Sequence, residues 1–189
     1  MIKAEKTIIP AKLNTENNSI RSKRKLVFII LSLVWMIVIF WYSSRNSELS
    51  TEDSQSVALT IGDITINDFD QWTTEAQYEY AASIDHPVRK AAHFSEYMLL
   101  GILLFGAWYD SDRKKSKNFL VPFIIGTVYA ASDELHQLLI SGRAGMISDV
   151  LIDSSGVLAG VLLSLLVVII FVKCITPHKD SRQPVEMVP

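Results

Sequence analysis

Four long apolar blocks, separated by polar segments, dominate the pattern of the chain. They cover residues 26–42 and approximately residues 91–109, 119–140 and 150–172. About 20 residues of helix are needed to cross the hydrocarbon core of a bilayer. A helix also satisfies its own backbone hydrogen bonds in lipid. The pattern therefore predicts an all-α integral membrane protein, built as a four-helix bundle over residues 26–172.

The polar segments predict how these helices are connected. Residues 1–25 and 173–189 are expected to be tails, the first of them disordered, and residues 43–87 a long loop. The links at 110–118 and 141–148 are short, which makes consecutive helices antiparallel neighbours. Within the loop, Phe69, Trp72, Ala76 and Tyr80 recur at near-helical spacing, so it holds either a short interfacial helix or a flexible linker.

The first apolar block follows a basic run, as a signal peptide would. However, the block is long for a signal-peptide core, and no small-residue cleavage pattern closes it. We therefore interpret residues 26–42 as a membrane helix, which ends in the interfacial aromatic residues Trp41 and Tyr42.

Lysine and arginine residues predict the orientation, because they are enriched in cytoplasmic segments. Fourteen lie on the side that holds both termini and the 110–118 link, and four lie on the other side. The four are Arg45, Arg89, Lys90 and Arg143. Both termini are thus expected in the cytoplasm and the acidic 43–87 loop outside, in a multi-pass protein of the cell membrane.

Composition adds little to this picture. The net charge of −2 indicates no particular partner beyond the lipid bilayer, and we expect no nucleic-acid partner. The single cysteine, Cys174, excludes an intramolecular disulfide and lies near a membrane edge.

Ionisable residues inside the predicted helices are the candidates for function, because such groups are expensive in lipid. At 100° per residue they form three stripes, one on each of the last three helices. The stripes comprise Arg89, His93 and Glu96; Asp133 and Gln137, flanked by Glu134 and His136; and Asp149 and Asp153, with Gly156 and Gly160. All three fall toward the same side of the membrane and are expected to converge in one pocket together with Arg143.

Several of these residues also have structural interpretations. Gly156 and Gly160 form a GxxxG pattern, which usually indicates close helix packing. Lys90 is expected to be an interfacial anchor, whereas Arg89 is expected to pair with a carboxylate. The carboxylates as a group could form a purely structural polar plug. The first helix carries no comparable group between residues 26 and 42 and is expected to contribute no ligand.

Four strings of the sequence resemble the VanZ-like family over residues 41–161. They are SSRNSELSTEDSQS, RKAAHFSEY, SDELHQ and GRAGMISDVLIDSSGVLAG. The resemblance implies that the family pattern falls on His93, Glu96 and Tyr97; Asp133, Glu134, His136 and Gln137; Gly142 and Arg143; and Asp149, Asp153 and Gly156. Relatives often carry Asn where this chain has Asp153.

The resemblance implies a role in the cell envelope, since the founding member is associated with low-level resistance to the glycopeptide teicoplanin. One hypothesis is binding of a lipid-linked wall component or a lipid-tailed glycopeptide. Its ligand-binding residues would be Arg89, Gln137 and Arg143, and Arg89, Lys90 and Arg143 could contact phosphate groups.

The alternative hypothesis is an intramembrane enzyme that acts on a lipid-linked envelope substrate. Its candidate catalytic residues are His93, Glu96, Asp133, Glu134, His136, Asp149 and Asp153. Carboxylates suit Mg²⁺ or Mn²⁺, and added imidazole admits Zn²⁺. A metal-free enzyme would use His93 or His136 as general base. The sequence selects no cofactor and no reaction class.

Overall fold

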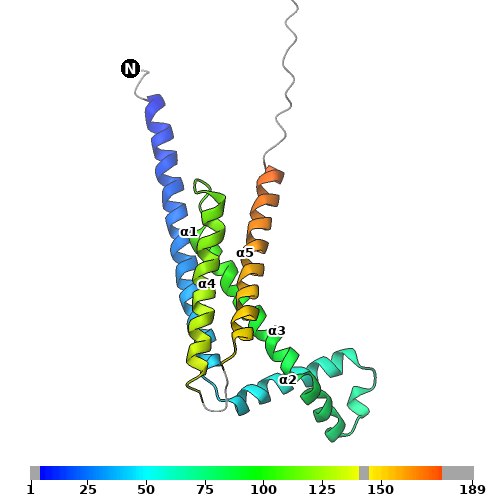
Figure 1. The fold of residues 1–189 in the computed structure, drawn as a ribbon. Coiled ribbons are helices and arrows are strands. Elements are labelled where there is room, and N and C mark those ends of the chain that lie inside the picture. The colour runs from blue at the N-terminus through cyan, green and yellow to red at the C-terminus, as the bar shows by residue number, and fades with distance from the viewer. Residues whose placement is uncertain (1–4, 141–144, 176–189) are drawn as a thin grey trace, which may run out of the picture.

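The computed structural model describes the backbone of residues 5–140 and 145–175 and the side chains of residues 18–140 and 145–174. Secondary structure in these ranges is entirely helical, which confirms the predicted all-α class. The elements are α1 (Glu5–Ser43), α2 (Ser47–Thr65), the short 3₁₀ helix η1 (Phe69–Gln71), α3 (Thr74–Trp108), α4 (Lys115–Gln137) and α5 (Ile147–Ile175) (Figure 1).

The helices α1, α4, α5 and the second half of α3 run side by side (Figure 1). The pair α3–α5 makes the most extensive contact, and α3 also packs on α1 and α4. The start of α1, the α3–α4 turn and the end of α5 lie together at one end. At the opposite end, which we call the hairpin end, α1 ends at Ser43, α4 ends at Gln137 and α5 begins at Ile147.

Residues 47–86, which we call the hairpin, were expected in a loop but fold as α2, η1 and the first part of α3. Asn46 and Thr73 cap the two helices, since their side chains accept hydrogen bonds from the amides of Leu49 and Ala76. The hairpin projects sideways from the hairpin end of the bundle (Figure 1).

The aromatic residues of the hairpin hold its tip together and do not form one continuous helix face. The Phe69 ring packs against Trp72 and Tyr80, with centroid separations of 5.2 and 5.4 Å. Phe69 is buried against Gly62 of α2, where a Cβ would collide with its ring. The near-helical spacing of these aromatic residues therefore reflects a cluster around the α2–α3 turn.

Two helices extend well beyond their apolar blocks. Helix α1 begins at Glu5, so the segment expected to be a disordered tail is helical from that residue onward. Helix α3 begins at Thr74, continues through Pro87 and only then enters its apolar block. Hydropathy reports where a helix meets lipid, and it does not report where the helix starts. The expected tail at 176–189 lies outside the described residues.

Ion pairs explain why the polar part of α1 stays in contact with the bundle. Lys25 lies 2.9 Å from Asp110 and Arg21 lies 2.6 Å from Asp112, both in the α3–α4 turn. The hydrogen bond from Lys25 holds the pKa of Asp110 below its usual value, and the hydrogen bond from Arg21 does the same for Asp112. This contribution to stability is present above the usual aspartate pKa and is lost as the pH falls through the lowered values.

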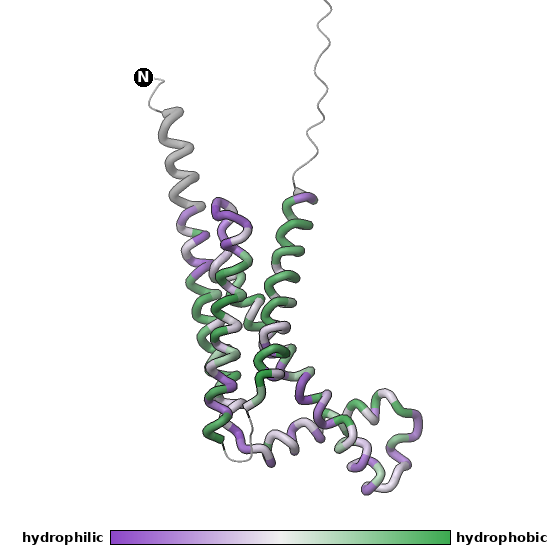
Figure 2. Tube along the Cα trace, viewed as in Figure 1, coloured by the Kyte–Doolittle hydropathy of each residue, from purple (hydrophilic) through white to green (hydrophobic). Residues whose placement is uncertain are grey.

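Within the described residues, three helical segments are long and apolar enough to cross a membrane: Asn18–Ser43, Thr74–Trp108 and Ile147–Cys174. Figure 2 shows the same concentration of apolar residues in the bundle. Helix α4 was expected to be a fourth crossing, and its composition alone does not place it in this group.

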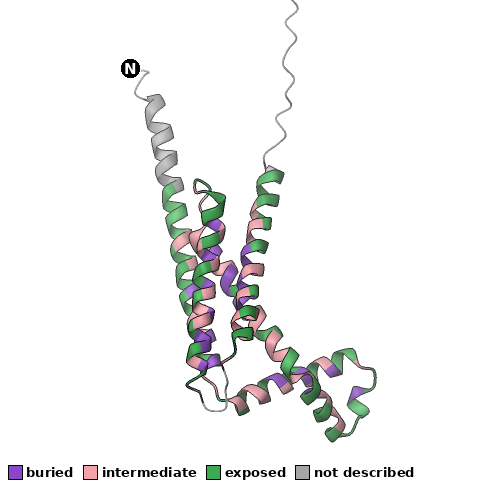
Figure 3. Ribbon diagram, viewed as in Figure 1, coloured by how far each residue is buried: buried purple, intermediate pink, exposed green. Residues whose placement is uncertain are grey.

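Helix α4 buries polar residues and exposes large apolar ones, which is the reverse of a helix on the surface of a soluble protein; Figure 3 shows which of its faces is buried. Its buried residues include the polar side chains Asn118, Asp133, Glu134 and Gln137. Its exposed residues include large apolar ones, namely Leu120, Ile124, Ile125, Val128 and Leu135. Four of the polar residues that lower its mean hydropathy are therefore buried against the rest of the protein.

Close approach of α3 and α5 depends on glycine. A Cβ on Gly156 would collide with the carbonyl oxygen of Phe94, and one on Gly160 with that of Met98. From the other side, a Cβ on Gly101 would meet the carbonyl oxygen of Val157. These contacts confirm the packing interpretation of the GxxxG pattern. The same close approach lets the buried core residues of α3 and α5 pack together, namely Tyr97, Leu100, Leu104, Val157 and Val161.

A side chain at Gly160 should therefore separate the two helices. We expect Gly160→Val to lower the free energy of unfolding by about 1–3 kcal/mol, as overpacking of a tight core does. Thermal unfolding of the purified protein in detergent measures this change. Ser155→Val is the matched control, because Ser155 lies on the exposed face of α5; an equal loss in both variants would refute the glycine contact.

Candidate functional site

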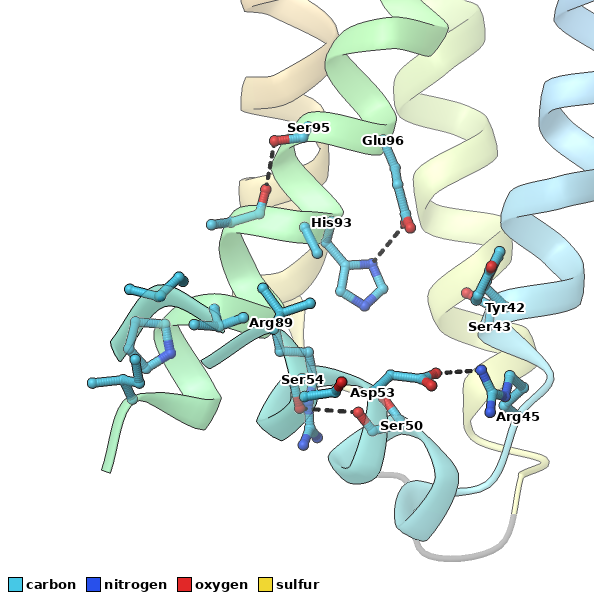
Figure 4. A pocket seen from close by; sticks show the side chains of 18 residues that line it. Tyr42, Ser43, Arg45, Ser50, Asp53, Ser54, Arg89, His93, Ser95 and Glu96 are labelled. Carbon is cyan, nitrogen blue, oxygen red and sulfur yellow. Dashed lines mark hydrogen bonds and ion pairs between the residues drawn. The ribbon is translucent and has the colours of Figure 1, made fainter. Parts of the chain in front are cut away.

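An open cleft of about 860 Å³ lies between the end of α1, helix α2 and the middle of α3 (Figure 4). Most of its wall is apolar, formed by Val57, Ile61, Ile84, Pro87, Val88, Ala91 and Ala92. The other lining residues are polar or carry a hydroxyl group: Tyr42, Ser43, Arg45, Ser50, Asp53, Ser54, Ser56, Arg89, His93, Ser95 and Glu96. The cleft thus combines an apolar surface with charged side chains. We call the part lined by Arg45, Asp53 and Arg89 the charged end of the cleft.

One ion pair and one hydrogen bond from an arginine hold α2 beside this cleft, and the second ion pair lies within α3. Arg45, just after α1, pairs with Asp53 of α2. Arg89 of α3 lies 2.8 Å from Asp85 and donates a hydrogen bond of 3.0 Å to Thr51 of α2. The expectation that Arg89 pairs with a carboxylate is confirmed, although the partner belongs to the hairpin and not to the polar stripes.

His93 connects the cleft with a second, much smaller cavity. This inner cavity has a volume of about 10 Å³ and is lined by Lys90, His93, Glu134, Asp149, Ile152 and Asp153. The Nδ1 atom of His93 lies 3.9 Å from carboxylate oxygens of both Glu96 and Asp153. A space of this size accommodates about one water molecule.

The inner cavity is rich in carboxylates and contains one lysine. Lys90 forms an ion pair with Asp149, so it does not act as the interfacial anchor that its position predicted. Glu134 accepts a hydrogen bond of 2.6 Å from the amide of Met146. Asp153 is almost completely buried, with 2% of its side chain exposed. The cavity therefore joins α3, α4 and α5 through polar groups.

Two carboxylate oxygens at this cavity have no hydrogen-bond donor within the described residues. Oδ1 of Asp153 and Oε2 of Glu134 accept no hydrogen bond from any residue in the described part of the chain. Burial of a polar atom without a hydrogen bond is unfavourable by roughly 1–3 kcal/mol. These atoms are consequently the ones most able to interact with a bound proton, water or ligand.

Three polar residues at the end of α4, namely Asp133, His136 and Gln137, face α1, whereas Glu134 lines the inner cavity. Ser43 donates a hydrogen bond of 2.6 Å to Asp133, and Gln137 Nε2 lies 3.3 Å from both of them. Ser44 Oγ lies 3.1 Å from Nε2 of His136. Ser43, the last residue of α1, and Ser44 directly after it thus supply hydrogen-bond partners to α4 just beyond the apolar block. The expectation that the first helix contributes no ligand stays a prediction.

The structure thus divides the predicted pocket into neighbouring groups. His93, Glu134, Asp149 and Asp153 line the inner cavity, with Glu96 beside His93 on the cleft. Asp133, His136 and Gln137 contact the end of α1, and Arg89 faces α2. Arg143 and Gly142 lie outside the described residues. Sequence reasoning did not identify Arg45, Ser43, Asp53 or Asp85 as site residues, although SSRNSELSTEDSQS carries three of them.

The carboxylates and histidines do not form a metal centre in the part of the chain that is described: no three His, Cys, Asp or Glu side chains there are grouped closely enough to hold a metal ion. The two histidines lie in different groups, with His93 at the cleft and His136 stacked on Phe40 at a centroid distance of 4.5 Å.

Membrane-length helices, exposed apolar residues on α4 and ionisable residues gathered inside the bundle define a helical membrane protein. A family model described as VanZ/LLP1 matches residues 28–171. The chain therefore belongs to the VanZ/LLP1 family, which confirms the resemblance seen in its motifs. No curated protein and no solved structure matches the chain significantly.

The hydrogen bond from Ser43 to the buried Asp133 should stabilise the contact between α1 and α4. We expect Ser43→Ala to lower the free energy of unfolding by about 1.5–3 kcal/mol, since a hydrogen bond to a charged group is lost. Denaturation of the purified protein measures the change. Ser155→Ala is the control, because that hydroxyl bonds only to its own helix at Ile152.

The same contact can be tested by combining substitutions. If Ser43 acts through Asp133, Ser43→Ala should have a much smaller effect in an Asp133→Asn background, because neighbours that share one interaction are not additive. Fully additive effects would show that the two side chains act separately.

Proposed function

We propose that this protein is a VanZ-like cell-envelope protein that binds a lipid-linked wall component or a lipid-tailed glycopeptide in the cleft. The observation that carries the proposal is the cleft itself, which places an apolar wall directly beside two arginines, a histidine and two carboxylates. Such a surface fits a molecule with a hydrocarbon chain and a polar head, since the two ends of the ligand need opposite environments.

The position of the cleft supports a ligand that stays in the membrane. It lies at the hairpin end of the bundle, where the apolar block of α1 ends at Tyr42 and the polar hairpin begins (Figures 2 and 4). A lipid could reach this level with its chain in the hydrocarbon and its head group at the interface. Teicoplanin also carries an acyl chain, which makes low-level resistance through binding at this surface consistent with the geometry.

We further propose that α4 is a fourth crossing and that both termini are cytoplasmic. The large side chains that α4 exposes between Leu120 and Leu135 are apolar, as expected for a helix that faces lipid, while Asp133, Glu134 and Gln137 are buried against the rest of the protein. The fourteen-to-four distribution of lysine and arginine favours the end with the α3–α4 turn as the cytoplasmic end. The cleft and the hairpin would then face outward.

The second candidate function is an intramembrane enzyme, and the inner cavity is the observation that favours it. The available oxygens of Asp153 and Glu134 lie beside His93, which also lines the cleft. A histidine between a substrate cleft and buried carboxylates is suited to general acid–base chemistry. Metal that is copurified in detergent and lost in both His93→Ala and Asp153→Asn would favour a metal-assisted form of this enzyme.

The proposed orientation predicts which positions a membrane-impermeant thiol reagent reaches. After Cys174→Ser removes the native thiol, a cysteine at Ser56 in the hairpin should react in intact cells. A cysteine at Ser116 in α4 should react only after permeabilisation. Both serines are exposed in the structure, so burial does not explain a difference. The reverse pattern would place the cleft on the cytoplasmic side.

Filling the cleft should remove lipid binding without unfolding the protein. We expect Ala92→Trp to weaken binding of a fluorescent acyl-chain lipid in detergent by at least about tenfold, or about 1.4 kcal/mol. Leu163→Trp, on the exposed face of α5, is the size-matched control. Equal binding by both variants and the parent protein would rule out the cleft as the lipid site.

A further inference from the structure

We propose that the charged end of the cleft recognises the phosphate group of its lipid ligand, which binds between Arg45 and Arg89. This inference rests on the proposed function and specifies the head group that the cleft accepts. The two arginines reach the cleft from different elements, Arg45 from the segment between α1 and α2 and Arg89 from the middle of α3 (Figure 4).

Arg89 offers a hydrogen-bond donor that the protein leaves unused. Its Nη2 group is engaged by Asp85 and Thr51. Its Nε group is buried and donates to no residue within the described ranges. A buried N–H without an acceptor is unfavourable. Arg89 lines the cleft and 29% of its side chain is exposed, so a ligand oxygen there can contact the guanidinium, and a shift of the side chain that exposes Nε to it gains a further hydrogen bond.

Arg45 has similar unused capacity. Guanidinium carries five N–H donors in a planar fork, and the ion pair with Asp53 uses the Nη1 group. The Arg45 side chain remains 24% exposed toward the cleft region. A phosphate oxygen can therefore approach Arg45 while Asp53 stays bound, or can displace Asp53, whose side chain is 49% exposed and readily solvated.

The contacts of Asp53 and Asp85 favour an anionic ligand over a cationic one beside the two arginines, and Glu96, the other acid of the cleft, lies beside His93. Asp53 is held by Arg45, and Asp85 is held by Arg89 and by the hydroxyl of Ser54. Both carboxylates are thus already satisfied, whereas donors on the arginines are not. A tetrahedral phosphate presents several acceptor oxygens, and arginine binds such groups in a bidentate manner.

The apolar wall decides in favour of a lipid phosphate over free phosphate. Residues such as Val57, Ile61 and Val88 line the same cleft, and this surface would contribute nothing to the binding of inorganic phosphate. Lys90 is not part of the proposed phosphate site, since it pairs with Asp149 and lines the inner cavity.

The two ion pairs allow a test that separates phosphate binding by the arginines from a purely structural role of the pairs. Each pair can be broken by substituting either its arginine or its aspartate. Binding of dioleoyl phosphatidic acid and of dioleoylglycerol is measured by native mass spectrometry of the purified full-length protein. The variants are Arg89→Gln, Arg45→Gln, Asp85→Asn and Asp53→Asn. Lys115→Gln is the control, because it removes an exposed positive charge at the start of α4, far from the cleft.

Phosphate recognition predicts opposite effects of the two kinds of substitution. Each arginine variant should weaken binding of phosphatidic acid about tenfold or more, and the aspartate variants should leave it unchanged or strengthen it. Lys115→Gln should change it less than twofold. Binding of dioleoylglycerol should be nearly constant across the set, because that lipid shares the chains and lacks the phosphate.

Other results would overturn the inference in distinct ways. Equal losses in the arginine and aspartate variants would mean that the ion pairs only hold α2 in place. Stronger binding in the arginine variants would indicate a cationic head group. If inorganic phosphate competed as effectively as phosphatidic acid, the ligand of the site would be a free anion and not a lipid. Failure of both lipids to bind the parent protein would refute the proposed function itself.

Discussion

Polar groups inside a membrane protein must find their partners within the protein, because lipid supplies none. This constraint organises α3, α4 and α5. The ion pair between Lys90 and Asp149 joins α3 to α5, and Glu134 joins α4 to the chain at Met146, just before α5. These contacts are made at the hairpin end, while the rest of the bundle packs through the apolar core and the glycines of α5.

The close α3–α5 contact and the polar groups depend on each other. With glycine at 156 and 160, the backbones approach so closely that a Cβ would collide with carbonyl oxygens of α3. The same approach brings Asp153, one turn before Gly156, to within 3.9 Å of His93. A wider separation would leave this almost fully buried carboxylate farther from the imidazole of His93. Packing and electrostatics thus act on the same interface.

The hairpin gives the protein a second kind of surface. Its apolar residues line the open cleft, and its acids hold the arginines that border the charged end. The cleft and the inner cavity share His93 as a lining residue. A ligand in the cleft would therefore lie beside the carboxylates of the inner cavity without entering that cavity. This arrangement accommodates both functions considered for a VanZ/LLP1 family member: binding at the membrane surface, and acid–base chemistry at the histidine.

The sequence by itself determined the helical class, the family and the ionisable residues that gather at one end, because hydropathy and residue spacing are local properties. It did not determine which acid meets which base. Arg89 turns to Asp85 and α2, Lys90 joins the inner cavity, and Ser43 of α1 bonds to Asp133. These pairings depend on how helices cross. Residues 47–86 looked like a loop because their polar composition hides a helical hairpin that is stabilised by caps and by contacts with α3, and only the tertiary structure showed that this hairpin forms one wall of the cleft.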